Sequence, residues 1–310
     1  MATCMLHPDH GYYSTRDPFG AKGDFTTAPE ISQMFGELIG LWVAQCWMDQ
    51  GRPDPFVLAE AGPGRGTLMA DILRVGAKVP GFRDAAEIVL IEASAHLRDV
   101  QEATLTGEKV HWVDAVSDLP DGPLFLVANE FFDALPIRQF TRHTSGWQEH
   151  SIGTQGGKLA LGLSAPAPVG ILDHRLDDTN PGDIVEICAP AQTILQDITA
   201  RIEKHGGVAL VIDYGDWESL GDTLQALKSH ERDDILAHPG QADLTAHVDF
   251  KALAEAAKGV SVTDMVPQGI LLERLGITPR AQALAQNLSD AALSSHIAAH
   301  RRLTHPDEMG

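Results

Sequence analysis

Residues Phe56–Gly76 read FVLAEAGPGRGTLMADILRVG, and the assignment of the fold starts from them. An apolar run from Phe56 to Ala59 ends in Glu60, and helical spacing of apolar residues begins after Thr67. Between them lie three glycines at alternate positions: Gly62, Gly64 and Gly66. The pattern predicts a buried parallel strand, a tight glycine turn and a helix. Because glycine lacks a Cβ and the helix start offers unpaired N–H groups, a ligand can approach this turn closely.

The spacing of the glycines separates three kinds of ligand-binding turn. The dinucleotide fingerprint G-x-G-x-x-G needs a glycine at position 67, where the chain has Thr67. The phosphate-binding P-loop needs Gly-Lys-Ser/Thr, and no lysine follows the turn. The remaining pattern, E-x-G-x-G-x-G, resembles the first-strand motif of class I S-adenosylmethionine (SAM) methyltransferases. The resemblance implies a SAM cofactor, with contacts from Glu60, Gly62, Gly64 and Gly66. A glycine-rich turn without a ligand is the alternative.

Alternating strand and helix patterns continue after this motif. Further strands are predicted at Glu87–Glu92, Val110–Val116, Leu124–Ala128, Val208–Ile212 and Val260–Val266, with a weaker one at Thr223–Ser229. Strands separated by helices predict an α/β, doubly wound, mostly parallel sheet.

Two segments lie outside this alternation. Thr27-Ala28-Pro29-Glu30 has the form of a capping box, and the apolar stripe behind it predicts one helix that packs on the sheet. After Arg138, short strand-like pieces predict a β-rich, antiparallel insertion after the fourth strand. They lie at Gln139–Thr144, Trp147–Ile152 and Leu159–Leu163. We therefore expect a single domain, residues 1–310, with an N-terminal extension at 1–52 and an inserted substrate-side subdomain at 138–187.

Polar residues follow several predicted strands at the edge where doubly wound sheets bind ligands. Glu92 ends the second strand, where an acid accepts hydrogen bonds from ribose hydroxyls. Asp114 ends the third strand, and in SAM enzymes a residue there often holds the adenine amino group. For both residues, the alternative is a solvated acid at a strand end.

The segment Asn129-Glu130-Phe131-Phe132-Asp133 follows the apolar fourth strand. Carboxylates and aromatic faces suit a cationic acceptor, so Glu130 and Asp133 are the candidate catalytic residues. Asn129 is predicted to bind the cofactor. The segment is similar to the Asn/Asp-Pro-Pro-Tyr/Phe loop of N-methyltransferases, although the prolines are absent. The alternative is that the two Phe are core residues and the two acids start a helix.

Five stretches in chain order together resemble the MidA-type SAM-dependent methyltransferases. They are GYYSTRDPFGAKGDFTTAPEISQMFGELIG, EAGPGRGTLMADILR, VANEFFDALPIRQF, VIDYG and DLTAHVDF. Mitochondrial relatives in this family are arginine methyltransferases that assist assembly of respiratory complex I. The resemblance implies a seven-stranded class I methyltransferase fold and arginine N-methylation of a complex I subunit. It also implies a cytoplasmic location in bacteria and the mitochondrial matrix for eukaryotic relatives.

Composition limits the choice of partners. The formal net charge of -20 argues against a nucleic-acid partner or an anionic membrane surface. No apolar window approaches the length of a membrane span. The three cysteines form no CxxC pair and the fourteen histidines lack ligand spacing, so we expect no metal site.

We therefore predict transfer of a methyl group from SAM to a protein arginine. Glu130 and Asp133 are expected to bind and deprotonate the guanidinium. The loop from Gly23 to Thr27 is expected to close over the cofactor, with contacts from Asp24 and Thr26. The alternatives are a non-catalytic SAM-binding assembly factor, a methyltransferase with a small-molecule acceptor and a nucleotide-dependent oxidoreductase. A homodimer is left open.

Overall fold

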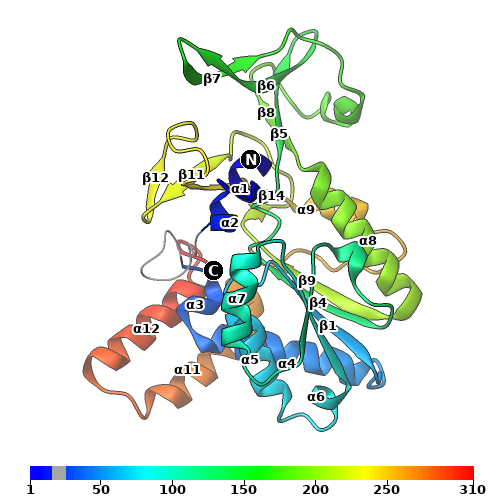
Figure 1. The fold of residues 1–310 in the computed structure, drawn as a ribbon, viewed down its shortest axis with the longest axis vertical. Coiled ribbons are helices and arrows are strands. Elements are labelled where there is room, and N and C mark those ends of the chain that lie inside the picture. Colours follow the sequence, from blue (N-terminus) through cyan, green and yellow to red (C-terminus); the bar gives the residue numbers. More distant parts are fainter. Residues whose placement is uncertain (16–25) are drawn as a thin grey trace.

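A central sheet of five parallel strands organises the molecule (Figure 1). The computed structural model describes residues 1–15 and 26–310. The strand order is β3-β2-β1-β4-β9. The strands are β1 (Phe56–Ala61), β2 (Ala86–Ile91), β3 (Val110–Val113), β4 (Leu124–Asn129) and β9 (Gly207–Ile212). The order reverses between β1 and β4, and ligands bind at such a switch point in doubly wound sheets.

Helices cover both faces of this sheet because side chains along each strand alternate between them. Phe56 and Leu58 of β1 pack in one buried cluster, and Val57 and Ala59 pack in the other. The first cluster includes residues of α4 (Gln33–Asp49), α5 (Thr67–Gly76), α10 (Gln268–Leu275), α11 (Ile277–Ala285) and α12 (Asp290–Thr304). The second includes residues of α8 (Ala189–His205) and α9 (Phe250–Ala256). Within the described residues, every helix is too short or too polar to cross a membrane.

The expectation of a seven-stranded sheet is wrong for the part of the chain that the structure describes. No strand forms at Val260–Val266. Strand propensity reflects fit to a half-buried pleated surface, and Val262 is 51% exposed, so this alternating segment has no face to bury. The weaker prediction at Thr223–Ser229 does yield a strand, but in a separate antiparallel sheet. That sheet has the order β12-β11-β13, from β11 (Gln225–Lys228), β12 (Glu231–Asp233) and β13 (Asp243–Thr245).

Thr27 precedes a helix with Pro29 in its first turn, as predicted, but the capping-box hydrogen bond of its side chain does not form. The chain forms a short helix, α3 (Ala28–Ile31), and α4 begins separately after Ser32. Thr27 makes no side-chain cap, whereas Ser32 Oγ accepts a hydrogen bond from Met34 N at 3.2 Å. Glu30 instead accepts a hydrogen bond from Thr67 Oγ1 at 2.7 Å, because the start of α5 lies beside it. The acid therefore links the N-terminal segment to the glycine turn.

The strand-like pieces after Arg138 are strands in the structure. A four-stranded antiparallel sheet, which we call the arm, has the order β7-β6-β5-β8. Its strands are β5 (Arg138–His143), β6 (Gly146–Gln155), β7 (Lys158–Leu163) and β8 (Ile184–Ile187), with the short helix η2 (Gly170–Arg175) between the last two. In Figure 1 the arm projects at the top of the view, far from α4 and α5 at the bottom. Its role as a substrate-side subdomain, residues 138–187, stays a prediction.

The remaining elements are short. They are α1 (Ala2–Leu6), α2 (Tyr12–Thr15), α6 (Phe82–Ala85), α7 (Ala95–Thr104), η1 (Val116–Asp118), β10 (Gly215–Asp216) and β14 (Val248–Asp249).

Candidate active site

The glycine turn, residues 62–66, joins β1 to α5 at the carboxyl edge of the sheet. Gly62, Gly64 and Gly66 have φ angles of 62°, 52° and 80°, a conformation that favours glycine. A Cβ at Gly62 would lie 2.8 Å from Cδ2 of Phe131. The turn therefore needs glycine at this position both for its backbone angle and for the approach of an aromatic ring.

Glu60 lies at the base of this turn, near the end of β1. Its side chain is 3% exposed, and its Oε2 is buried without a hydrogen-bond partner among residues 1–15 and 26–310. Burial raises the pKa of the carboxyl from 4.5 to about 8, although the Met69 N–H group opposes this rise. A buried polar atom without a partner is costly, so a group that donates a hydrogen bond here would be stabilised.

Glu92 is connected to the glycine turn through Gln101. Glu92 Oε1 accepts a hydrogen bond from Ser94 N at 2.8 Å, and Oε2 accepts one from Gln101 Nε2 at 3.2 Å. The same nitrogen donates to Gly64 O at 2.8 Å. Burial raises the pKa of Glu92. The side chain is buried, so the alternative of a solvated acid is wrong for Glu92.

Asp114 follows β3 at the same edge but is more open. Its side chain is 79% exposed and forms an ion pair with Arg98 at 2.6 Å. Arg98 Nε also donates to the backbone oxygen of Glu92 at 2.8 Å. Arg98 therefore brings the ends of β2 and β3 together. The contact of Asp114 with adenine stays a prediction.

The acceptor loop, residues 129–133, begins where β4 ends. Glu130 has a φ of 50°, and its N–H group donates to Ile212 O at 2.8 Å. Its Oε1 accepts hydrogen bonds from Ala28 N at 3.1 Å and from Asn129 Nδ2 at 3.3 Å. Burial outweighs these bonds and raises the pKa of Glu130 to about 7. Asn129 Oδ1 is buried and has no hydrogen-bond partner in the described part of the chain.

Asp133 closes the acceptor loop and is 7% exposed. Burial raises its pKa, and the charges of Asp213, Glu130 and Asp243 act in the same direction. No helix begins within residues 130–137, so the predicted alternative of helix-start acids is wrong for Asp133. Glu130, in contrast, does accept the first N–H group of α3.

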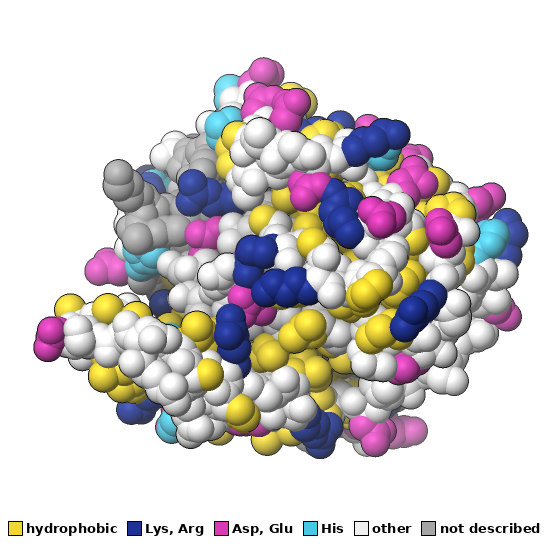
Figure 2. Space-filling model, turned by 90° about the horizontal axis from the view of Figure 1, so that it is seen from below, with side chains coloured by type: hydrophobic (Ala, Val, Ile, Leu, Met, Phe, Trp, Pro, Cys, Tyr) yellow, Lys and Arg dark blue, Asp and Glu magenta, His cyan; other side chains and the backbone are white. Residues whose placement is uncertain are grey.

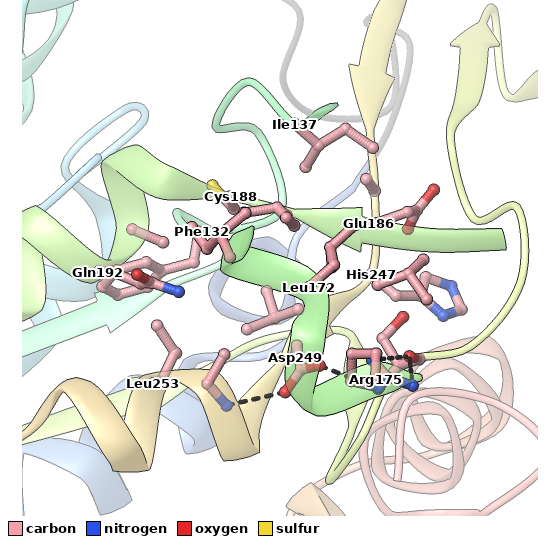
Figure 3. A pocket seen from close by; sticks show the side chains of 18 of the residues that line it. Phe132, Ile137, Leu172, Arg175, Glu186, Cys188, Gln192, His247, Asp249 and Leu253 are labelled. Carbon is pink, nitrogen blue, oxygen red and sulfur yellow. Dashed lines mark hydrogen bonds between the residues drawn. The ribbon is translucent and has the colours of Figure 1, made fainter. Parts of the chain in front are cut away.

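The two aromatic residues of the loop have different surroundings. Phe131 is partly buried and contacts Gly62, whereas Phe132 is 2% exposed and belongs to the apolar cluster under α8 and α9. Phe132 also lines a cavity of about 80 Å³ that Leu172, Cys188 and Leu253 help to enclose (Figure 3). The core alternative therefore holds for Phe132. The lining of this cavity includes no residue of the glycine turn, so it is distinct from the cofactor side of the loop.

The residues at this edge fit SAM. SAM carries an amino group and ribose hydroxyls. Within the described residues, the site offers two buried oxygens without hydrogen-bond partners, Glu60 Oε2 and Asn129 Oδ1. The Cβ-free surface of the turn leaves room for close approach. Thr26 is half-buried, and its predicted cofactor contact stays a prediction, whereas Asp24 lies outside the described residues. Residues 1–15 and 26–310 contain no cluster of His, Cys, Asp or Glu arranged to hold a metal ion.

Together the fold and this edge define a SAM-dependent methyltransferase of the doubly wound α/β class. The chain belongs to the family described as putative S-adenosyl-L-methionine-dependent methyltransferase, whose model matches residues 38–267. This membership confirms the family, the enzyme class and the cofactor expected from the sequence, and it removes the oxidoreductase alternative.

Relatives of known name cover the whole chain. It is 36% identical over 341 residues to the human protein arginine methyltransferase NDUFAF7, mitochondrial, covering 100% of this chain and 76% of the relative. The protein of the same name from Danio rerio is 36% identical over 337 residues, covering 100% and 80%. A likely methyl transferase from Burkholderia thailandensis was crystallised with S-adenosyl-homocysteine. It superposes with a TM-score of 0.80 at 28% identity, covering 100% of this chain and 83% of that one.

Sequence reasoning missed Asp213 as a residue of the site. Its Oδ2 accepts hydrogen bonds from the N–H groups of Phe131, Phe132 and Asp133 at 3.2, 2.8 and 3.3 Å. Its position in the sequence could have indicated this role. Asp213 directly follows the apolar run of the fifth predicted strand, Val208–Ile212, and therefore lies at the same edge of the sheet.

Proposed function

We propose that this chain methylates an arginine guanidinium of a protein, with Glu130 and Asp133 as the catalytic carboxylates. The observation that carries the proposal is a pair of carboxylates on one short loop, Asp133 buried and Glu130 partly buried, whose Phe131 lies against Gly62 of the glycine turn. A guanidinium stays protonated in water and pairs well with carboxylates. The names of the relatives, which are protein arginine methyltransferases, support the same acceptor.

The mechanism divides binding and proton transfer among the residues of this edge. SAM supplies a methyl group on a positively charged sulfur. Glu60, Asn129 and Glu92 would hold its polar groups, together with the glycine turn, Asp114, Asp24 and Thr26. Glu130 would orient one guanidinium nitrogen and take its proton. A pKa of about 7 suits this role, because a general base works best near the ambient pH.

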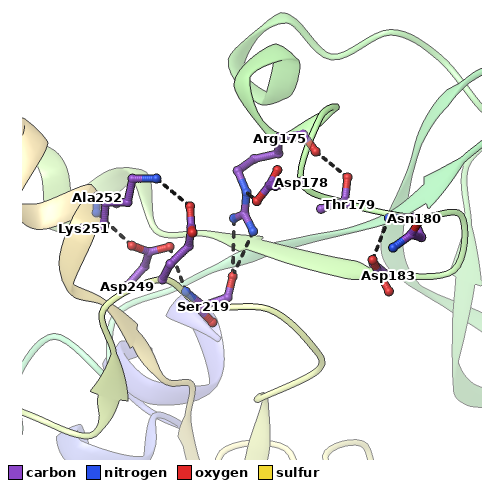
Figure 4. A network of polar contacts seen from close by, with 10 residues as sticks. Arg175, Asp178, Thr179, Asn180, Asp183, Ser219, Asp249, Lys251 and Ala252 are labelled. Atoms are coloured by element: carbon purple, nitrogen blue, oxygen red, sulfur yellow. Dashed lines mark hydrogen bonds and ion pairs between the residues drawn. The ribbon is translucent and has the colours of Figure 1, made fainter.

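The arm favours a protein acceptor over a small molecule. Ile152 of β6 pairs with Leu161 of β7, so the two side chains share a face of the hairpin, and they are 56% and 53% exposed. An exposed apolar face is typical of a protein-binding surface. Arg175 of η2 is anchored to the body of the molecule, since both of its terminal nitrogens lie 3.4 Å from Ser219 O (Figure 4). We propose that the arm forms one wall of a groove for the substrate protein.

The substrate is proposed to be a subunit of respiratory complex I, from the family resemblance. The curated relatives carry the word mitochondrial in their names, and a cytoplasmic location for a bacterial chain stays a prediction. A homodimer stays a prediction.

Tritium transfer from labelled SAM tests the acceptor class. The protein is incubated with a bacterial protein extract, and in parallel with the small-molecule fraction of that extract. We expect labelled protein, with methylarginine identified by mass spectrometry. Label that enters only small molecules, or only other residue types, would contradict the proposal.

A further inference from the structure

We propose that Asp213 is a positioning residue that holds the acceptor loop in its reactive conformation, an inference that rests on the proposed function of that loop. Asp213 follows β9 directly and faces the loop that follows β4. One carboxylate oxygen receives three consecutive backbone N–H groups, from Phe131, Phe132 and Asp133. The other oxygen accepts the N–H group of Tyr214 at 2.9 Å.

The backbone of the loop is shaped for this contact. The N–H group of Glu130 still belongs to the β4–β9 ladder, since it donates to Ile212 O at 2.8 Å. The left-handed conformation of Glu130 then turns the chain, and successive N–H groups after such a turn form a concave anion site. Beyond the turn, Asp133 O accepts a hydrogen bond from Ala246 N at 2.9 Å. Asp213 therefore fixes the middle of a segment whose two ends are already bound.

The loop and the carboxylate depend on one another. A buried anion is costly unless hydrogen bonds compensate it, and the loop provides three. Without Asp213, the same three N–H groups would lack a partner in a largely buried segment. An uncharged residue at position 213 would let the acceptor loop rearrange. Glu130 and Asp133, which belong to this loop, would then leave their positions.

The charge of Asp213 also acts on Asp133. The groups that face this pair are Glu130, Asp243, Tyr13 and Tyr214. Burial raises the pKa of Asp213 to about 7, and its charge is the largest electrostatic contribution that raises the pKa of Asp133. Removing the charge should lower the pKa of Asp133. Since Asp133 must be ionised to bind a guanidinium, the acid limb of the pH–rate profile should move to lower pH.

The variant Asp213→Asn separates this role from a merely structural one. Asn keeps the size and one acceptor oxygen, but its NH₂ group must face either the loop or Tyr214 N, and both offer donors. The matched control is Asp216→Asn, an exposed carboxylate three residues further on. Hydrogen exchange is measured at the amides of residues 131–133. SAM affinity is measured by calorimetry. Methyl transfer from SAM to arginine-containing peptides of a protein digest is followed from pH 6 to pH 9.

We expect faster exchange at residues 131–133 and transfer reduced by about thirtyfold, within the range for loss of a positioned catalytic group. We also expect unchanged SAM affinity and an acid limb shifted to lower pH, with Asp216→Asn like the wild type. Unchanged exchange, or an unshifted acid limb with full activity, would overturn the positioning role. If wild-type protein transfers no methyl group to arginine, the proposed function fails, and hydrogen exchange still decides whether Asp213 holds the loop.

Discussion

At the scale of single residues, the carboxylate of Glu130 has the largest part in the proposed chemistry. The variant Glu130→Gln keeps an oxygen that can still accept the hydrogen bonds from Ala28 N and Asn129 Nδ2. The fold and SAM affinity should therefore persist, while methyl transfer falls by about a hundredfold or more through loss of a proton acceptor. Glu102→Gln, an exposed acid on α7, is the control. Full activity in the Glu130→Gln enzyme would exclude the carboxylate mechanism.

Glu92 belongs to the cofactor side. Glu92→Ala should weaken SAM binding by about 1.5–3 kcal/mol, the cost of losing hydrogen bonds to a charged group. The same change leaves Ser94 N and Gln101 Nε2 without their partner, so the thermal stability should fall as well. Glu92→Gln keeps the size and separates the two effects. Calorimetric titration with SAM and thermal unfolding are measured for both variants, and an unchanged SAM affinity in both would remove Glu92 from the cofactor site.

At the scale of elements, the hairpin of β6 and β7 is the feature that distinguishes a protein acceptor from a small one. The double variant Ile152→Ser/Leu161→Ser removes apolar surface without touching the buried core. We expect transfer to intact protein to fall by about tenfold, which corresponds to about 1.4 kcal/mol, while transfer to a short arginine peptide is unchanged. Ile297→Ser on α12, which is 58% exposed, is the control. Equal losses with protein and peptide would show that the hairpin is not a docking surface.

The elements also show what local pattern can predict. Apolar runs ending in polar residues located β1, β2, β4 and β9 of the central sheet, because a buried parallel strand has a continuous apolar signature. The edge strand β3 was predicted from the mixed segment Val110–Val116, and it is only partly buried. The same reasoning failed at Val260–Val266, where an alternating pattern finds no sheet to join. The prediction of a capping-box hydrogen bond at Thr27 failed as well. The side chain of Glu30 accepts a hydrogen bond from Thr67, a residue far along the chain, and the local pattern does not show this contact.

At the scale of the whole molecule, the site depends on contacts between distant segments. Glu60, Glu92 and Glu130 could be located from strand ends alone. The contact between Asp213 and the acceptor loop joins residues about eighty positions apart, and no local pattern encodes it. Burial of these acids is likewise a property of the assembled fold. Glu60 and Glu92 lie inside the fold, whereas the face of the molecule shown in Figure 2 carries acidic and basic side chains interspersed with apolar ones.

Three acids with raised pKa values, one buried and two partly buried, should make the stability of the whole molecule depend on pH. Burial raises the pKa of Glu60 to about 8, and the pKa values of Glu130 and Asp213 to about 7. In the unfolded chain these groups lose their protons at their ordinary, lower pKa values. Their contribution to stability is therefore complete below those values and is lost as the pH rises through the folded pKa values.

We expect the unfolding temperature of the cofactor-free protein to fall as the pH rises from 6 to 8. Over this range Glu60 alone should lower the free energy of unfolding by on the order of 2 kcal/mol. Its carboxyl keeps a proton in the folded protein that the unfolded chain has lost. Glu60→Gln has no proton to lose there, so its unfolding temperature should depend less on pH than that of the wild type. Glu87→Gln, an exposed acid on the neighbouring strand β2, is the matched control and should keep the wild-type slope. Calorimetric scans at constant ionic strength give the slopes, and equal slopes for Glu60→Gln and the wild type would mean that Glu60 is ionised in the folded protein.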